Sequence, residues 1–447
     1  KKVGIIGLGI SGFETGIFCL ENGIEVYISE KNISDDIKEK AEILKEKGAK
    51  VEIGKHTPEF FKDVEFVVIS PGVDERNEFI DFLKEKKIPI ISEIEFAYNF
   101  SKSKKIIAIT GTNGKTTTTT MVGNIFEKAG YPIVICGNIG NTFIGEIKNI
   151  EEKTWIILEV SSFQLEKIVN FRPYISCLLN IDYDHFDRYS SMEEYINAKK
   201  RIFENQNEND FSVLNFDDYY TKRLLKDIKT QKRFFSFSKI LNGVYYENGA
   251  IFLNLNNKNL KILETKNLKI EGRGNIANIM ASSLISILSE IDIETIKTAI
   301  ENFEGLPHRM EKVAEINGII YINDSKSTNP HSVKNSILSL KGENNIILIL
   351  GGKDKGFPYH QLKKYLKNRV KFLILLGEAK ERIKKELLSS NIPMEYVENL
   401  KEAVILSKKI GKKGDFVLFS PGCSSFDMFK NYKERGDAFK KEVLALY

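Results

Sequence analysis

Residues 106–117 read Ile106-Ile107-Ala108-Ile109-Thr110-Gly111-Thr112-Asn113-Gly114-Lys115-Thr116-Thr117, an apolar run followed by a glycine-containing loop. The run predicts a short buried strand, and spaced apolar side chains after the loop predict a helix: Met121, Ile125, Phe126 and Ala129. Strand, tight loop and helix in this order are typical of an α/β domain with a mainly parallel sheet.

The composition of this loop suits the binding of phosphate groups. Glycines allow backbone amides to approach phosphate oxygens, Lys115 can neutralise the β- and γ-phosphates, and the Thr116 hydroxyl can ligate Mg²⁺. The strict phosphate-loop pattern is not met, because Ile109 stands where its first glycine would lie. The sequence nevertheless predicts an ATP site formed by Gly111, Thr112, Asn113, Gly114, Lys115, Thr116 and Thr117.

Candidate metal ligands follow two further apolar runs. The run 155–158 ends in Glu159, and the run 175–179 leads to His185. At the carboxyl end of a parallel strand, such side chains point into the ligand crevice of an open sheet. Each residue taken alone could equally be a helix cap or a buried polar group, but two of them beside one phosphate loop favour a metal site.

The helix predicted over residues 191–203 carries a lysine on its apolar face. Ser191 and Glu194 have the spacing of a capping box. One face carries three apolar side chains and one lysine: Met192, Ile196, Lys199 and Phe203. A lysine on a buried face needs a partner or a changed charge state, so Lys199 is either ion-paired, extended to solvent, or chemically altered.

A second glycine loop lies near the N-terminus. Gly7-Leu8-Gly9-Ile10-Ser11-Gly12 follows an apolar run at 3–6 and precedes a helix predicted over 11–21, a context that brings backbone amides close to a pyrophosphate. Glu30, after a strand predicted at 25–29, stands where a ribose-binding acid is expected. The pattern does not distinguish a dinucleotide from a nucleotide sugar, and glycines also permit tight packing without a ligand.

The length of 447 residues, at roughly 150 per domain, predicts three domains. Polar residues at 100–105, and a glycine and a proline within 304–309, interrupt the alternation of strand and helix patterns. Apolar runs then recur in the last third, at 346–350, 372–376 and 416–419, and predict another open parallel sheet. The predicted domains are residues 1–103, 104–305 and 306–447.

Charge and cysteine content exclude several classes of protein. A net charge of +5, from 66 basic and 61 acidic residues, is too dilute for a nucleic-acid binder. The four cysteines are far apart and form no CxxC pair, which favours a reducing cytoplasm. Apolar runs fall short of the roughly 20 residues of a membrane-spanning helix. We expect a cytoplasmic monomer with small-molecule partners, no nucleic acid and no membrane insertion.

Four longer motifs resemble those of one enzyme family. They are Gly7-Leu8-Gly9-Ile10-Ser11-Gly12, Ser161-Ser162-Phe163-Gln164-Leu165, Asp184-His185-Phe186-Asp187-Arg188-Tyr189 and Ser420-Pro421-Gly422-Cys423-Ser424-Ser425-Phe426-Asp427. With them almost the whole chain resembles the Mur ligases, ATP-dependent amide-forming enzymes of peptidoglycan synthesis. The fold that this implies has a Rossmann-like N-terminal domain for a UDP-sugar, a central P-loop ATPase domain with a mainly parallel sheet, and a Rossmann-like C-terminal domain for an amino acid.

The resemblance also implies a reaction. The four motifs are most similar to those of the branch that adds D-glutamate to UDP-N-acetylmuramoyl-L-alanine. The Asp-Asn-Pro-Arg signature and the His-rich N-terminal motif of two sister branches are absent. ATP would phosphorylate the substrate carboxylate, and the amine would attack the acyl phosphate to give a tetrahedral intermediate. The preference for D- over L-glutamate rests wholly on the resemblance.

Roles near the phosphates are implied in the same way. Lys115 would hold the transferred phosphoryl group, and Thr116 and Glu159 would bind one Mg²⁺. His185 would bind a second Mg²⁺, and Lys199 matches the lysine that these enzymes carbamoylate. A carbamate would turn the buried ammonium into an oxygen donor near the metals.

The remaining roles belong to the substrates. By resemblance, Asn138 and Ser161 would contact the UDP-linked substrate, Asn138 near the reacting carboxyl. Asn278 would meet adenine, Arg309 the phosphate across the interdomain cleft, and Asp324 the ribose of ATP. The D-glutamate set is Lys326, Thr328, Lys355, Ser425 and Phe426. The uridine set is Ile10, Ser11, Glu30 and Ser70, although Ser29-Glu30-Lys31 departs from the family order of acid, hydroxyl and basic residue.

Three other readings remain open at this stage. A related ligase of the folylpolyglutamate type would use another acceptor, but the N-terminal loop and the turn at 425–426 argue against it. An NAD-dependent oxidoreductase is favoured by the first glycine loop alone. A P-loop switch or motor would hydrolyse ATP without either ligase substrate.

Overall fold

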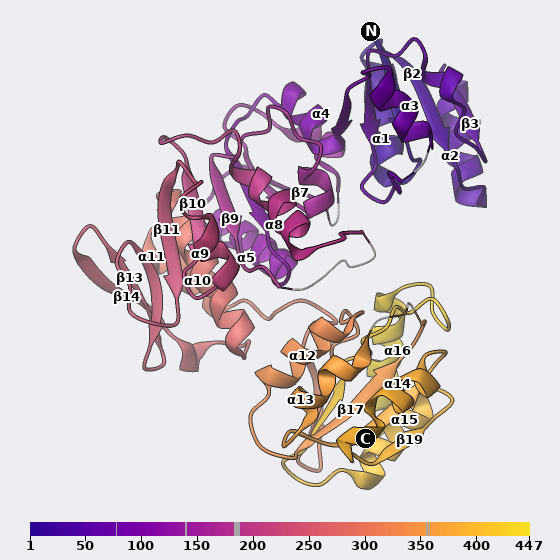
Figure 1. Cartoon of the computed structure of the whole chain (residues 1–447). Helices are drawn as coiled ribbons and strands as arrows, with labels where there is room; N and C mark the ends of the chain where they lie inside the picture. Colours follow the sequence, from indigo (N-terminus) through magenta and orange to yellow (C-terminus); the bar gives the residue numbers. More distant parts are fainter. Residues whose placement is uncertain (77, 139–140, 183–187, 355, 357) are drawn as a thin grey trace. The chain divides into compact units, whose positions relative to one another are not determined.

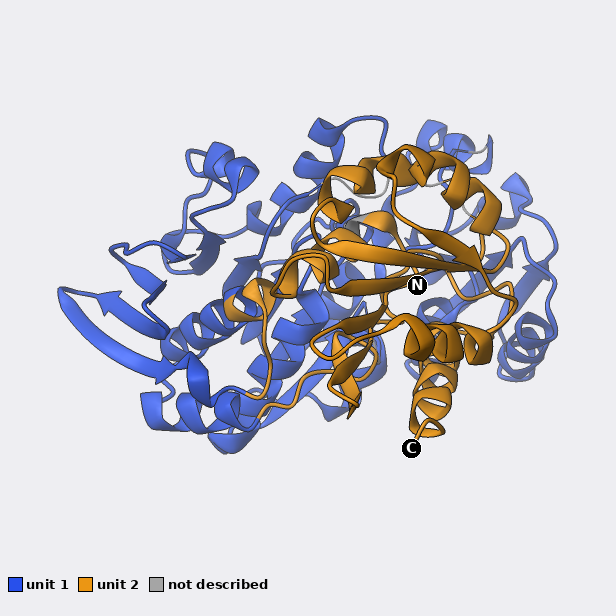
Figure 2. Ribbon diagram, turned by 90° about the horizontal axis from the view of Figure 1, so that it is seen from below, with its two compact units in different colours: residues 1–268, 277–302 blue, residues 269–276, 303–447 orange. Residues whose placement is uncertain are grey.

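The computed structural model describes residues 1–76, 78–138, 141–182, 188–354, 356 and 358–447. Within these residues the strands form three sheets, so the predicted three-domain α/β class is confirmed (Figure 1). The chain divides into two compact units, residues 1–268 with 277–302 and residues 269–276 with 303–447 (Figure 2). The domain limits at 103 and 305 stay predictions. No described helix is long and apolar enough to cross a membrane.

The first sheet is parallel, with the described strands in the order β3-β2-β1-β4-β5. Its strands are β1 (Lys2–Ile6), β2 (Glu25–Glu30), β3 (Lys50–Ile53), β4 (Phe66–Ile69) and β5 (Ile90–Ser92). Its helices are α1 (Ile10–Glu21), α2 (Asp35–Glu46), α3 (Glu78–Glu85) and α4 (Glu93–Phe100), with the 3₁₀ turn η1 (Pro58–Phe61). The chain reverses its direction of travel across the sheet between β1 and β4, and ligands of open α/β sheets bind beside such a switch point.

The second sheet has the order β14-β13-β12-β11-β10-β9-β6-β8-β7 among the described strands. These are β6 (Ile106–Thr110), β7 (Ile133–Gly137), β8 (Trp155–Glu159), β9 (Ile175–Leu178), β10 (Phe211–Asn215), β11 (Gln231–Ser236), β12 (Gly243–Glu247), β13 (Ala250–Leu255) and β14 (Lys258–Glu264). The pairs from β7 to β12 are parallel, and β12-β13-β14 are antiparallel. All of β6 is buried, as its apolar run predicts.

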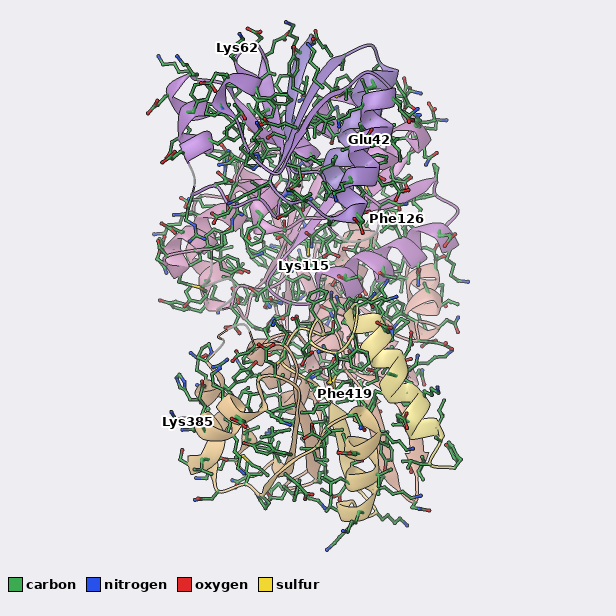
Figure 3. All side chains as sticks on the ribbon, turned by 90° about the vertical axis from the view of Figure 1, so that its right-hand side faces the viewer. Glu42, Lys62, Lys115, Phe126, Lys385 and Phe419 are labelled. Atoms are coloured by element: carbon green, nitrogen blue, oxygen red, sulfur yellow. The ribbon has the colours of Figure 1, made fainter. Side chains whose placement is uncertain are left out.

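Helices and 3₁₀ turns lie between the strands of the second sheet and after its last strand. They are α5 (Lys115–Lys128), α6 (Phe143–Glu146), η2 (Ile147–Asn149), α7 (Ser162–Leu165), α8 (Met192–Lys200), η3 (Arg201–Phe203), α9 (Tyr219–Leu224), η4 (Thr265–Asn267), α10 (Arg273–Leu288) and α11 (Ile293–Glu301). Phe126 on α5, labelled in Figure 3, is fully buried in the domain core. The helix begins directly after Gly114 of the phosphate loop.

The third sheet has the order β15-β16-β20-β17-β18-β19 in the described part of the chain. Its elements are β15 (Glu311–Ile316), β16 (Ile319–Asn323), α12 (Pro330–Ser339), β17 (Ile346–Gly351), η5 (Tyr359–Leu362), α13 (Lys363–Leu366), β18 (Val370–Leu376), α14 (Lys380–Leu387), η6 (Leu388–Ser390), β19 (Met394–Tyr396), α15 (Leu400–Ile410), β20 (Phe416–Phe419) and α16 (Tyr432–Leu444). The predicted open parallel sheet is confirmed for β16, β20, β17, β18 and β19, and it differs from the prediction at one edge, where β15 runs antiparallel to β16.

The reason for this difference is a two-residue turn. Asn317 and Gly318 join β15 to β16, with φ of 54° and 76°. Positive φ at both central residues is the type I′ geometry that Asn-Gly favours and that closes an antiparallel hairpin. The same pair, Asn248 and Gly249, joins β12 to β13.

Carboxylates on α4 join the first two sheets within one compact unit. Glu93 Oε1 accepts a hydrogen bond from Ile144 N at 2.5 Å. Glu95 accepts from the amides of Val169 and Phe171 at 2.9 and 2.8 Å. Both acids are buried, so these amide contacts compensate the cost of removing their charges from water.

Candidate active site

The loop after β6 has the geometry of a phosphate-binding turn. Gly114 is the N-cap of α5 and has a φ of 86°, a left-handed conformation that favours glycine. Lys115 Nζ donates to the carbonyl oxygens of Gly111 at 2.8 Å and Thr112 at 3.3 Å. The cation therefore lies against the loop backbone, beside the amides at the start of the helix.

The segment that follows β9 supports the loop. Asn113 N donates to Asn180 Oδ1 at 2.8 Å, and Asn180 Nδ2 donates to Asn113 O at 3.0 Å. Asp182 N donates to Thr112 Oγ1 at 2.9 Å, and the Tyr195 hydroxyl lies 3.0 Å from the same oxygen. The sequence did not single out Asn180 or Tyr195, although the place of Asn180 directly after the apolar run 175–179 was an available signal.

Glu159 ends β8 beside this loop. Its side chain is 2% exposed, and the sheet register pairs it with Ile109 of β6. Asn138, which follows β7, donates its backbone N–H to Glu159 O at 2.8 Å and its amide Nδ2 to Oε1 at 3.4 Å. Thr116 lies in the first turn of α5 and is half-buried.

Carboxylate and hydroxyl oxygens fit the preference of Mg²⁺ for hard ligands, and here they lie at one edge of the second sheet. The described residues contain no cluster of three histidine, cysteine, aspartate or glutamate side chains that could hold a metal ion. The predicted ligand His185 lies outside the described residues. Among the predicted metal ligands on β8 and in the first turn of α5, the described residues therefore include Glu159 and Thr116.

Lys199 reaches the same loop from α8. It is 1% exposed, which confirms the predicted burial, and Nζ donates to Gly111 O at 3.1 Å and Thr110 Oγ1 at 3.3 Å. The cap of α8 differs from the predicted box: Ser191 accepts from Glu194 N, but the Glu194 carboxylate accepts from Ser190 N.

The complete capping box lies on α7. Ser161 Oγ accepts from Gln164 N at 3.3 Å, while Gln164 Oε1 accepts from Ser161 N at 3.0 Å.

Asn278 of α10 lies against the phosphate loop and is 7% exposed. A Cβ atom on Gly114 would be 2.3 Å from Asn278 Oδ1. Any residue larger than glycine at position 114 would therefore clash with the side chain of Asn278.

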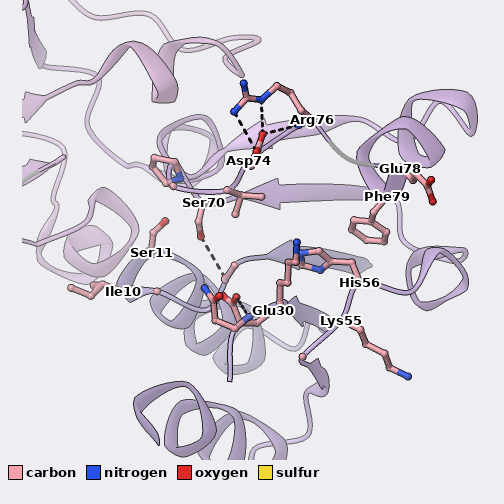
Figure 4. A pocket seen from close by; sticks show the side chains of 18 residues that line it. Ile10, Ser11, Glu30, Lys55, His56, Ser70, Asp74, Arg76, Glu78 and Phe79 are labelled. Atoms are coloured by element: carbon pink, nitrogen blue, oxygen red, sulfur yellow. Dashed lines mark hydrogen bonds and ion pairs between the residues drawn. The ribbon is translucent and has the colours of Figure 1, made fainter. Parts of the chain in front are cut away.

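A cavity of about 830 Å³ opens at the carboxyl ends of the strands of the first sheet (Figure 4). It brings together the four residues of the predicted uridine set: Ile10, Ser11, Glu30 and Ser70. Glu30 accepts from Leu8 N and from Asn32 N, each at 2.7 Å, so its carboxylate holds the glycine loop closed. Ser70 Oγ donates to Gly7 O at 3.4 Å on the other side of the cavity.

Asp324, at the end of β16 in the second unit, is a buried hydrogen-bond centre. Its Oδ2 accepts from the hydroxyls of Ser327, Ser336 and Ser420, and its Oδ1 accepts from Met310 N. Burial raises the pKa of Asp324, and these hydrogen bonds oppose the rise. The sequence predicted a ribose contact and did not predict this network.

The predicted D-glutamate residues occupy neighbouring loops of the second unit. Lys326 Nζ lies 4.2 Å from the ring centre of Tyr432, and Thr328 is half-buried. Ser425 is 3% exposed, and Phe426 is 65% exposed. Lys355 lies outside the described residues. Arg309, in the loop before β15, is half-buried and donates its backbone N–H to Leu306 O at 3.2 Å.

Arg435 connects these loops, and no pattern in the sequence predicts this role. Its guanidinium is buried and donates to Ser325 O at 2.7 Å, to Ser325 Oγ at 3.0 Å and to Cys423 O at 2.9 Å. Ser325 precedes Lys326, and Cys423 lies two residues before Ser425. Arg435 therefore fixes the backbone beside both predicted amino-acid contacts.

Curated relatives cover the whole chain. It is 42% identical to the UDP-N-acetylmuramoylalanine--D-glutamate ligase of Caldanaerobacter subterraneus subsp. tengcongensis, over 100% of this chain and 98% of the relative. It is 41% identical to the protein of the same name from Citrifermentans bemidjiense, with the same coverage.

Solved structures share the fold. A pseudomurein peptide ligase type C from Methanothermus fervidus matches with a TM-score of 0.63 at 19% identity, over 100% of this chain and 99% of that one. UDP-N-acetylmuramate-alanine ligase from Thermotoga maritima matches with a TM-score of 0.59 at 21% identity, over 100% of both chains.

Family models cover each of the three sheets. A MurD-like N-terminal domain of Mur ligases matches residues 1–92, a Mur ligase middle domain matches 109–286, and a Mur ligase glutamate ligase domain matches 308–423. Together with relatives that are more than 40% identical over the full length, these matches establish the family. This chain belongs to the Mur ligases.

Proposed function

We propose that this chain joins D-glutamate to UDP-N-acetylmuramoyl-L-alanine with cleavage of ATP to ADP and phosphate. The observation that carries the proposal is the convergence of two lysines on one atom. Lys115 Nζ and Lys199 Nζ both donate to Gly111 O, at 2.8 and 3.1 Å. Lys115 places a cation at the phosphate loop, which suits the transfer of a charged phosphoryl group, and Lys199 places a modifiable amine beside it. Relatives of matching length carry the name of this ligase.

The reaction proceeds in two transfers. The carboxylate of the UDP-linked substrate attacks the γ-phosphorus of ATP, the bond to ADP breaks, and an acyl phosphate forms. The amine of D-glutamate then attacks the acyl carbon, and the tetrahedral intermediate loses phosphate and a proton to leave an amide. Lys115 stabilises the negative charge of the transferred group, and the loop amides orient it.

Two Mg²⁺ ions complete the ATP site in this proposal. Thr116 and Glu159 hold one ion, and His185 with a carbamoylated Lys199 serves the other. Bound Mg²⁺ neutralises phosphate charge. Lys199 gains its carbamate when its neutral amine attacks CO₂ and loses a proton, which replaces a buried cation with an anion of two oxygen donors. The 1% exposure of Lys199 supports this assignment, because solvent does not stabilise its charge there.

Each domain binds one of the three substrates. Residues 1–103 bind the uridine nucleotide through Ile10, Ser11, Glu30 and Ser70. Residues 104–305 bind ATP and metal, with Asn278 at the adenine and with Asn138 and Ser161 at the substrate near its carboxyl group. Residues 306–447 bind D-glutamate through Lys326, Thr328, Lys355, Ser425 and Phe426, and contribute Arg309 and Asp324 to ATP. We place this monomeric enzyme in the cytoplasm, at a step of peptidoglycan synthesis.

A phosphate-release assay tests the function. We expect release only when ATP, Mg²⁺, UDP-N-acetylmuramoyl-L-alanine and D-glutamate are all present, and little release with L-glutamate. Release without either ligase substrate would indicate a switch or motor. Release with another amino acid in place of glutamate would indicate a related ligase with a different acceptor.

A further inference from the structure

The cavity of the first sheet has two chemically different ends. At one end are the glycine loop after β1 and the beginning of α1, which offer backbone amides to phosphates. At the other end is His56, in the loop after β3. Because β3 and β1 are separated by β2, these ends lie about two strand spacings, ~10 Å, apart. An extended nucleoside diphosphate spans such a distance from its phosphates to its base.

The His56 ring is held by its neighbours. It stacks on Phe79 with 5.0 Å between ring centres and an angle of 13° between planes, as Figure 4 shows. Its Nδ1 lies 2.7 Å from Ser29 Oγ, and Ser29 is fully buried in β2. Two contacts from different elements therefore fix both the plane of the ring and its rotation.

The partners of Ser29 decide which ring nitrogen carries the proton. Ser29 Oγ lies 2.8 Å from Glu52 Oε1 and 3.2 Å from Lys55 O, and a carboxylate and a carbonyl only accept. The hydroxyl has one hydrogen, and the charged carboxylate is the stronger acceptor for it. Toward His56 the hydroxyl must then accept, so Nδ1 carries the hydrogen and Nε2 keeps its lone pair.

The free lone pair is available to a ligand. Within the described part of the chain, Nε2 has no hydrogen-bond partner, and His56 lines the cavity. Burial lowers the pKa of His56, and although Glu30 and Glu52 oppose this effect, the neutral ring is the form expected near pH 7. The base end of the cavity thus presents one fixed acceptor.

We propose that His56 selects uracil at this end by accepting the N3–H of the base on Nε2, with Ser29 and Glu52 as positioning residues. The assignment rests on the proposed function, which supplies the uridine nucleotide. Uracil carries a hydrogen on N3, whereas cytosine has a lone pair there, which would face the lone pair of Nε2. A buried acceptor left without a donor costs enough to discriminate between closely similar ligands.

Binding of UDP and CDP to the full-length protein, measured by calorimetry, tests the proposal. We expect the wild-type protein to bind UDP about tenfold more tightly than CDP, the effect of one hydrogen bond. His56→Asn keeps a donor near the Nδ1 position but has no atom at Nε2, so UDP affinity falls about tenfold and approaches that for CDP. His56→Gln can place its carbonyl oxygen near the Nε2 position, so it retains the preference for UDP.

The paired variants separate recognition from a structural role. If His56 only holds Ser29, Asn substitutes for it and Gln does not, which reverses the expected order and overturns the proposal. Equal wild-type affinities for UDP and CDP overturn it as well. Wild-type protein that binds neither UDP nor UDP-N-acetylmuramoyl-L-alanine refutes the proposed function, and with it this assignment. Thermal melting of each variant shows that the comparison concerns folded protein.

Kinetics give an independent measure. Because the base lies far from the reacting carboxyl, His56→Asn should raise KM for the UDP-linked substrate about tenfold and leave kcat unchanged. Ser29→Ala removes the acceptor for Nδ1–H without touching the ligand, so the ring can carry its hydrogen on either nitrogen. A smaller rise in KM with a reduced preference for UDP is expected. An unchanged ratio of UDP to CDP affinity in Ser29→Ala contradicts the positioning role.

Discussion

Two glycine loops in this molecule share a backbone design and differ in charge. Each follows a central strand of a mainly parallel sheet and leads into a helix, α1 after Gly9 and α5 after Gly114. The first loop is closed by a carboxylate, since Glu30 accepts from Leu8 N. The second contacts two lysine side chains, those of Lys115 and Lys199.

The difference shows how a glycine loop before a helix can either bind a diphosphate or assist the transfer of a phosphoryl group. Backbone amides at a helix N-terminus bind an anion without altering its reactivity, which is sufficient for a diphosphate that stays intact. Transfer of a phosphoryl group also requires charge stabilisation in the transition state, and the fixed cation of Lys115 supplies it. We therefore expect changes at the second loop to affect kcat, and changes at the first loop to affect KM for the UDP-linked substrate.

The largest effect is expected for Lys115→Ala. Loss of the cation at the phosphate loop should lower kcat about 10³-fold, with a small change in thermal stability. Steady-state kinetics with saturating substrates measure the loss. Lys128→Ala, an exposed lysine at the other end of α5, is the matched control and should remain active. A change in KM for ATP alone would show that Lys115 binds without assisting transfer, which would remove the contrast between the loops.

The second-largest effect is expected for Lys199→Ala, which should lower kcat about 10²-fold. If Lys199 carries a carbamate, short carboxylates added to the assay restore part of the activity. A ¹³C NMR carbamate signal also appears in wild-type protein equilibrated with labelled bicarbonate and is absent from the variant. Lys200→Ala removes a partly exposed neighbour that pairs with Asp227 and should change neither measurement. Full activity of Lys199→Ala without added carboxylate would refute the carbamate.

Sequence patterns predicted the buried strands of the fold. Apolar runs such as 106–109 and 346–350 marked buried parallel strands, which need no alternation because both faces are covered. The antiparallel hairpins β12-β13 and β15-β16 were missed, since their strands are partly exposed and their sequences show no regular period. Their signal was the turn rather than the strand, in the pairs Asn248-Gly249 and Asn317-Gly318.

The candidate site likewise contains some residues whose position the sequence predicts and others whose role depends on tertiary contacts. Lys199 could be predicted because helical spacing alone places it on a buried face. The partners that support the loops could not, because Asn180, Tyr195 and Arg435 gain their roles from contacts with distant residues. Asp324 gathers hydroxyls from positions as far apart as 327 and 420, a relation that only tertiary structure supplies.

Glycine substitutions compare the two loops directly. Gly114→Ala places a Cβ 2.3 Å from Asn278 Oδ1 and strains a φ of 86°, so kcat/KM for ATP should fall about 20-fold. Gly7→Ala, with a φ of 94° and a Cβ 2.9 Å from Ser70, should instead raise KM for the UDP-linked substrate. Gly130→Ala has a similar φ of 80° and open space, so it measures strain alone. If all three variants lose stability without distinct kinetic effects, the loops are structural turns.

The smallest effect, and the most discriminating one, is expected for Glu30→Gln. One amide oxygen replaces two carboxylate oxygens, so either Leu8 N or Asn32 N faces an NH₂ group and loses its acceptor. The loop should loosen, and KM for the UDP-linked substrate should rise about fivefold at unchanged kcat. Glu25→Gln, at the opposite end of β2, controls for loss of charge on the same strand. A fall in kcat comparable with that of Lys115→Ala would mean that Glu30 takes part in phosphoryl transfer, and the two loops would then differ in position but not in role.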